Sequence, residues 1–241
     1  MWRASGLALV IVAGCGRGFF NPDLGGQCDG DVATGPAPRF VQANFTSSGG
    51  VQAQGRTVAF TLAQSAGNAI VVVVMWDASS ATVDSLYDDA GNAYMAAVGP
   101  TLNGNNWAQT IFLASNIKAV APGNNVVHAA FSTPAFVRVA IAEYADVDTA
   151  QPLDGTASMT GTPGTAVSPG SILTTHASDM LVAATSSSGA LSADYPTFMQ
   201  RTSGPDYVLQ DKPADVAQGY TPLAAAGNFD WVAHVIALRG R

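Results

Sequence analysis

The sequence has little charge, and most of that charge is acidic. Charged residues make up 11% of the chain and the formal net charge is −7, whereas an average soluble domain has about 25% charged residues. The ten basic residues are scattered singly, so no basic stripe is present that would neutralise nucleic-acid phosphates. The composition therefore argues against nucleic-acid binding and against charge-driven docking on anionic lipid headgroups.

Recognisable catalytic motifs are also missing. No Gly-x-Ser-x-Gly elbow occurs that would present a nucleophilic serine. The three histidines, His128, His176 and His234, are far apart and lack the His-x-His or His-Glu-x-x-His spacing typical of zinc sites. The chain has a single glutamate, Glu143, which lies in an apolar run and is the acid to inspect for a hydrolase site.

Only two cysteines are present, and the first of them, Cys15, follows a short apolar segment. Arg3 places a positive charge near the N-terminus, and residues 7–13 are apolar. This stretch is too short to cross about 30 Å of hydrocarbon, so it indicates an export signal over residues 1–14. Small residues at positions 13 and 14 precede Cys15, as a cleavage site requires.

The run Val12-Ala13-Gly14-Cys15 resembles the lipobox of bacterial lipoproteins. The resemblance implies cleavage before Cys15 and acylation of both its Sγ and its freed amine, which would give a firm membrane anchor. Gly16, rather than Asp, follows the cysteine, and by the same resemblance this implies an outer-membrane address. Two alternatives stay open: an ordinary signal peptide with a coincidental cysteine, and a disulfide to Cys28. In a lipoprotein, Cys28 would be free or would pair with another molecule.

The mature chain divides into a linker and one domain. Residues 15–38 are rich in Gly, Pro and Asp and show little periodicity, which is typical of a flexible tether. From residue 39 to residue 241, short apolar runs alternate with turn residues, and no stretch has a helical period. Residues 145–170 are expected to form a loop, and residues 88–92 a hairpin turn between strands at 81–87 and 94–98. Further strands are expected at 56–62, 69–76, 110–114, 126–131, 136–144, 171–174, 180–186 and 229–239.

These patterns predict an all-β, two-sheet antiparallel sandwich as a single domain over residues 39–241. Residues 69–76 are continuously apolar and β-branched, so this strand is expected in the middle of a sheet or buried on both faces. Gly67-Asn68 before that strand, Trp76 at its end, the turn 89–94 and Glu143-Tyr144 at a strand end together resemble a jelly-roll-like domain of secreted bacterial and phage proteins. The resemblance implies a fold, but not an activity.

Two groups of residues are candidate binding sites. Trp107 lies among amide side chains (Asn105, Asn106 and Gln109) in a loop, a combination that suits sugar rings and their hydroxyls, unless Trp107 packs under its own loop. Oxygen-bearing side chains crowd one turn (Asp84, Asp88, Asp89 and Asn92), where they are either a structural calcium site or ordinary turn residues.

The sequence as a whole favours a lipid-anchored, non-enzymatic cell-envelope protein that binds a glycan or a protein partner. The alternatives are a hydrolase whose site is assembled from scattered residues and a purely structural envelope protein. No cofactor is expected apart from the calcium ion considered at the 84–92 turn.

Overall fold

The computed structural model describes residues 35–77, 80–104, 107–164, 166–191, 197–222 and 229–241. Cys15 and Cys28 lie outside these residues, as do Asn105 and Asn106. Among the described residues, no helix is long and apolar enough to cross a membrane. The export signal, the lipidation and the tether therefore stay predictions.

The described residues form fifteen β-strands, and every pairing between them is antiparallel. In chain order they are β1 (Arg39–Ser47), β2 (Ala53–Ala59), β3 (Ala69–Asp77), β4 (Val83–Asp88), β5 (Met95–Asn103), β6 (Trp107–Ala114), β7 (Val126–Ala135), β8 (Val137–Ala145), β9 (Leu153–Gly161), β10 (Ile172–Leu173), β11 (Asp179–Ser187), β12 (Met199–Gly204), β13 (Tyr207–Ala214), β14 (Gly219–Tyr220) and β15 (Trp231–Leu238).

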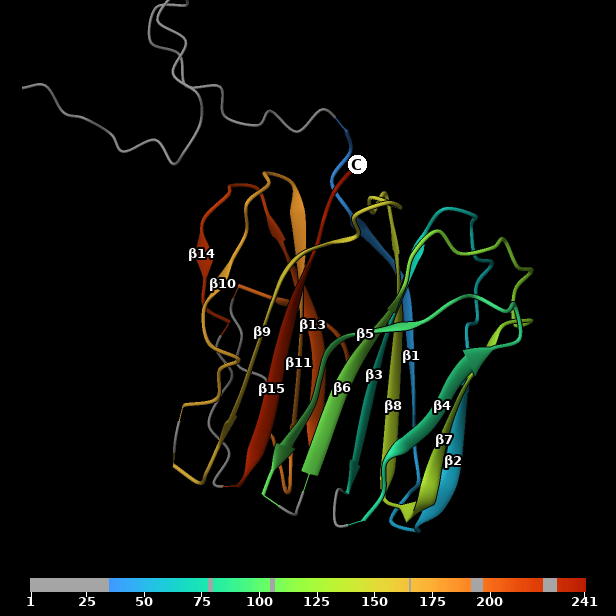
Figure 1. Ribbon diagram of the computed structural model, residues 1–241, viewed down its shortest axis with the longest axis vertical. Helices are drawn as coiled ribbons and strands as arrows, with labels where there is room; N and C mark the ends of the chain where they lie inside the picture. Colours follow the sequence, from blue (N-terminus) through green and yellow to red (C-terminus); the bar gives the residue numbers. More distant parts are fainter. Residues whose placement is uncertain (1–34, 78–79, 105–106, 165, 192–196, 223–228) are drawn as a thin grey trace, which may run out of the picture. The chain divides into compact units, whose positions relative to one another are not determined.

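The middle layer is a five-stranded sheet with the order β1-β8-β3-β6-β5 (Figure 1). Its central strand, β3, contains the run of β-branched residues, and eight of its nine residues are buried. Because side chains alternate across a strand, Ile70 and Val72 belong to one hydrophobic core, whereas Val71 belongs to another. The expectation that this strand is buried on both faces is confirmed.

Two outer sheets cover the central sheet, and Figure 1 shows the three layers side by side. The sheet β2-β7-β4 packs on one face, where Phe60 and Phe131 join the core of Ile70. The sheet β12-β13-β11-β15-β9 packs on the other face, where Leu209 and Ile236 join the core of Val71. The short pair β10-β14 lies against the outer side of that second sheet.

The prediction of an all-β antiparallel sandwich is confirmed, and the structure adds a third layer to it. Two local predictions are wrong. Strands β4 and β5 do not form a hairpin, because β4 pairs with β7 and β5 pairs with β6, so the 88–92 turn carries the chain from an outer sheet to the central one. Residues 145–170 are not all loop, because β9 pairs along its length with β15.

The first and last described residues meet at one end of the sandwich. Gly35 contacts the backbone of Arg241, and a Cβ built on Gly240 would lie 3.2 Å from the carbonyl oxygen of Pro36. Strand β1 starts close to this point and runs for nine residues to Ser47. At about 3.3 Å per residue, its far end lies about 30 Å away.

Candidate ligand-binding site

Trp107 lies at the end of the sandwich to which β1 runs. It is the first residue of β6 and is partly exposed, whereas Trp76 and Trp231 are buried in cores. A pocket of about 340 Å³ opens beside Trp107, and we call it the distal pocket. Its walls are formed by Phe45, Ser47, Ser48, Gly49, Gly50, Trp107, Phe136, Arg138, Pro205 and Asp206.

Strand alternation determines which side chains reach the distal pocket. Trp107 and Ile111 share one face of β6, and Arg138 and Ala140 share one face of β8. Ile111 and Ala140 pack in the core between the central sheet and the second outer sheet, so Trp107 and Arg138 point into that layer at its edge. Asp206 comes from the opposite layer, in the turn between β12 and β13.

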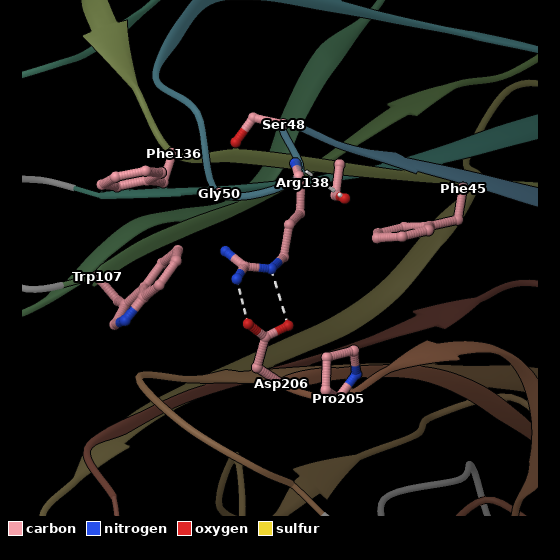
Figure 2. Close-up of a pocket in the computed structure, with 10 residues that line it drawn as sticks. Phe45, Ser48, Gly50, Trp107, Phe136, Arg138, Pro205 and Asp206 are labelled. Carbon is pink, nitrogen blue, oxygen red and sulfur yellow. Dashed lines mark hydrogen bonds and ion pairs between the residues drawn. The ribbon is translucent and has the colours of Figure 1, made fainter.

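Arg138 and Asp206 join the two layers across the pocket (Figure 2). Nε of Arg138 donates to Oδ1 of Asp206 at 2.8 Å, and Nη2 of Arg138 donates to Oδ2. Both side chains are largely shielded, with exposed fractions of 19% and 16%. A two-point pair of this kind holds the guanidinium plane in a fixed orientation. The guanidinium carbon also lies 4.5 Å from the centroid of the Trp107 ring, which adds a cation–π contact.

Aromatic side chains form another wall of the distal pocket. Phe45 stacks on Tyr207 with ring centroids 4.0 Å apart and planes 16° apart. Burial raises the pKa of Tyr207 to about 12, so this ring is a neutral phenol at physiological pH. Its hydroxyl group is 2.9 Å from Oγ1 of Thr202. The wall is thus apolar and held in place from behind.

Hydrogen-bonding groups remain available in the distal pocket. Within the described part of the chain, neither the indole N–H of Trp107 nor Nη1 of Arg138 has a hydrogen-bond partner. The carboxylate of Asp206 can accept further bonds, because each oxygen has two lone pairs. The pocket therefore presents donors and acceptors beside aromatic surface.

The predicted companions of Trp107 do not all gather in the pocket. Gln109 is fully buried between the sheets, where its Nε2 donates to the carbonyl oxygen of Ala184 at 3.1 Å. Asn105 and Asn106 lie outside the described residues. The pocket residues that the sequence reading missed, Arg138 and Asp206 among them, are distant in sequence and meet only because the two layers pack.

The residues considered for calcium form a hydrogen-bonded turn. Asp88 is buried, and its oxygens accept from the backbone N–H and Nδ2 of Asn92, the hydroxyl of Tyr94 and Nδ2 of Asn125. Burial by itself would raise the pKa of Asp88, but these donors outweigh it and lower the pKa. The donors occupy the directions from which a cation would approach. The geometry favours turn chemistry here, and Asp84 and Asp89 do not contribute to this network.

Glu143 is fully buried and accepts hydrogen bonds from β1 and from the segment that precedes β3. Nε2 of Gln42 donates to Oε2 at 2.7 Å, and Nδ2 of Asn68 donates to Oε1 at 2.6 Å. The backbone N–H of Ser65 donates to Oε1 at 3.4 Å. A carboxylate enclosed in this way stabilises the junction of β1, β3 and β8, and the geometry gives it no access to a substrate.

The three histidines lie in three different environments. His128 is next to Asp89, with Nε2 and Oδ1 2.9 Å apart, and stacks on Tyr87 on an outer sheet. His234 is completely buried on β15, and burial lowers its pKa to about 3. His176 lies beside Asp154, with Nδ1 and Oδ1 2.8 Å apart.

Comparisons with known proteins do not assign the chain to a family. No family model matches it, and no curated protein matches it. One solved structure, described as "Crystal Structure of the STIV MCP", aligns with 83% of this chain and 97% of its own chain, at 8% identity and a TM-score of 0.23. A similarity this low carries no functional argument.

Proposed function

We propose that this chain is a bacterial lipoprotein, held at the outer membrane by lipid on Cys15, whose β-sandwich binds a glycan in the distal pocket without catalysing a reaction. The observation that carries the binding proposal is the Trp107 indole next to the two-point Arg138–Asp206 pair in an open pocket. The lipid anchor rests on the lipobox resemblance at residues 12–15.

The chemistry of the pocket suits a sugar. A sugar ring has an apolar face of C–H groups and a rim of hydroxyls, and each hydroxyl both donates and accepts hydrogen bonds. Trp107 and Phe45 offer aromatic surface to the ring face, and Arg138 and Asp206 offer donors and acceptors to the hydroxyls. The Arg138 charge is balanced by Asp206, which favours a neutral ligand over an anionic one.

The size of the pocket sets the expected affinity. A volume of about 340 Å³ is at the lower end of ligand sites and has room for one or two sugar rings. At about 0.3 kcal/mol per non-hydrogen atom, a hexose of about twelve such atoms would gain about 4 kcal/mol, which corresponds to a Kd of about 1 mM. Many such proteins displayed on one membrane would bind a polysaccharide more tightly through avidity.

The chain's connectivity agrees with a display role. The tether enters the sandwich at residue 35, beside Arg241, whereas the distal pocket lies past the other end of β1. A lipid at Cys15 would hold the sandwich by the end that is remote from the pocket. The pocket would then be free to meet a ligand away from the bilayer.

A glycan array followed by fluorescence titration tests the binding proposal. The protein is the mature chain with Cys15→Ala, which removes the lipid. Trp107 is the partly exposed tryptophan of the described residues, so a ligand in the pocket should change its emission. Trp107→Ala should abolish binding, whereas Tyr87→Ala, which removes an exposed aromatic ring on a different sheet, should leave it intact. Equal binding by both variants, or no array signal for the parent, would refute the proposal. Capture of a protein but no glycan would favour a protein partner.

Metabolic labelling with a palmitate analogue tests the anchor. The wild-type chain should become labelled and fractionate with the outer membrane. Cys15→Ala should stay unlabelled and should keep its signal peptide, whereas Cys28→Ser should be labelled as wild type. An unlabelled wild-type chain would rule out the lipoprotein assignment, and the glycan-binding result would still stand.

A further inference from the structure

Three potential metal ligands meet beside the second outer sheet. Asp154 lies on β9, His176 follows β10, and Asp179 is the first residue of β11. The sequence separates them by up to 25 positions, but each offers a ligand atom, and these atoms all lie within 4.8 Å of one another. Among the described residues, this is the group that has the composition and spacing of a metal site.

The cluster contains a completely buried carboxylate, that of Asp179. Neither of its oxygens makes a hydrogen bond of normal geometry with a described residue, although the backbone N–H of Gly240 and the carboxylate of Asp154 lie close to it. Burying a carboxylate without partners costs several kcal/mol, so native structures pair such groups with a cation or a donor. Its neighbour here is instead a second carboxylate, that of Asp154, which makes the burial still less favourable.

Among the described residues, no arginine or lysine side chain forms an ion pair with Asp179. Arg239 directs Nη1 to Oε1 of Gln151 at 2.6 Å and Nε toward Asp148 at 3.9 Å, rather than to Asp179. A divalent cation at the centre of the cluster would balance the charges of both carboxylates.

The other two ligands are held in place by the surrounding loop. The backbone N–H and the hydroxyl of Thr175 both donate to Asp154. Oδ1 of Asp154 lies 2.8 Å from Nδ1 of His176, which holds the imidazole ring next to the carboxylate. The His176 side chain is 24% exposed, which provides a route of entry from solvent.

We propose that Asp154, His176 and Asp179 bind one divalent transition-metal ion. One imidazole and two carboxylates are ligands that Zn²⁺ accepts, and three protein ligands leave a fourth position for water. Calcium fits less well, because it prefers six to eight oxygens. The site is separate from the distal pocket, and the glycan proposal does not depend on it.

The position of the site gives the metal a structural role. Asp179 follows Ser178, and a Cβ built on Gly240 would lie 2.6 Å from the carbonyl oxygen of Ser178 and 3.2 Å from that of Pro36. The ion would therefore join β9, β11 and the 174–178 loop next to the point where the tether enters the sandwich. A ligand that binds only the folded state stabilises it in proportion to the logarithm of its concentration.

Zinc binding by the full mature chain tests the proposal. The background is Cys15→Ala with Cys28→Ser, so that no thiol binds zinc. The protein is treated with a chelator, dialysed against Zn²⁺ and analysed by elemental mass spectrometry and thermal melting. The expected results are one zinc ion per chain and a melting temperature that rises with zinc concentration.

Matched variants identify the ligands. Asp179→Asn and His176→Gln should each weaken zinc binding by more than about 100-fold, because even loss of an outer-shell partner costs about 10- to 100-fold. His128→Gln is the control. His128 also contacts an aspartate, Asp89, but these two residues are not part of a group of three potential metal ligands. It should keep one zinc ion per chain.

Two results would overturn the proposal. A parent chain that binds less than one zinc ion per molecule would show that the cluster does not hold this metal. Zinc that survives His176→Gln and is lost in His128→Gln would place the ion elsewhere. If Asp179→Asn does not fold by circular dichroism, the half-buried His176 still provides the decisive variant.

Discussion

Replacing His234 with leucine should remove a steep acid sensitivity from the fold. His234 lies on β15, opposite Ala184 of β11 and Ser158 of β9, on the side that faces the central sheet. Neither of its ring nitrogens has a hydrogen-bond partner in the described structure. With no partner for its charged form, the folded protein keeps this imidazole neutral, and burial lowers its pKa from 6.5 to about 3.

The size and sign of the effect follow from proton linkage. Between pH 6.5 and 3 the unfolded chain binds a proton at His234 and the folded chain does not, so acid favours unfolding. Each pKa unit corresponds to about 1.4 kcal/mol. The free energy of unfolding therefore loses nothing to His234 above pH 6.5. Protonation of His234 in the unfolded chain lowers this free energy by about 2.5 kcal/mol between pH 7 and 4.5, and lowers it further as the pH approaches 3.

Urea unfolding at half-unit steps from pH 7.5 to 4.5 measures this prediction. The other titrating groups are common to both proteins, so the difference between the wild-type and His234→Leu curves isolates His234. That difference should change by about 2.5 kcal/mol in favour of the variant as the pH falls. His128→Leu is the control and should keep the wild-type slope, because His234 is still present. Parallel curves for wild type and His234→Leu would refute the reasoning.

Three further substitutions test buried polar groups and close packing. Asp88→Ala removes the acceptor of four hydrogen bonds and should lower the free energy of unfolding by about 3 kcal/mol in urea titration. Glu143→Gln should cost about 2–4 kcal/mol, because its amide group faces other donors, yet binding at the distal pocket should be unchanged. Gly99→Ala should lower the melting temperature by several degrees, because Gly99 has φ +95° and a Cβ would lie 2.6 Å from the carbonyl oxygen of Gln109. A stability equal to wild type in any of the three would contradict the assigned packing.

The strands with strong patterns could be predicted from sequence, and the weakly patterned ones could not. The β-branched run of β3 specified a strand covered on both faces, because only burial suits eight apolar residues in succession. β9 was missed because its sequence, Leu-Asp-Gly-Thr-Ala-Ser-Met-Thr-Gly, is small and polar, as suits a strand at the edge of a sheet. β12 and β13, also unassigned, turn at Gly204-Pro205 and gain their stability from neighbouring strands.

The candidate sites show the same limit. Trp107 was identified because an aromatic residue in a polar loop stands out in sequence. Its partners Arg138 and Asp206 are 68 positions apart, and no local pattern links them. Likewise, His176 looked isolated because its two acids lie on different strands. Contacts between layers depend on how sheets stack, which periodicity alone does not specify.

The placement of β15 has a consequence for how the protein is made. This strand comes after all the others in the chain, yet it lies inside its sheet, between β11 and β9. The strands of that sheet cannot all pair until β15 has left the ribosome. In the same way, β1 cannot pair with β8 until about a hundred more residues have been synthesised. Folding dominated by such distant pairings is slow. A nascent chain that stays extended for longer is also the form that a secretory channel can thread, so late pairing would assist the export proposed above.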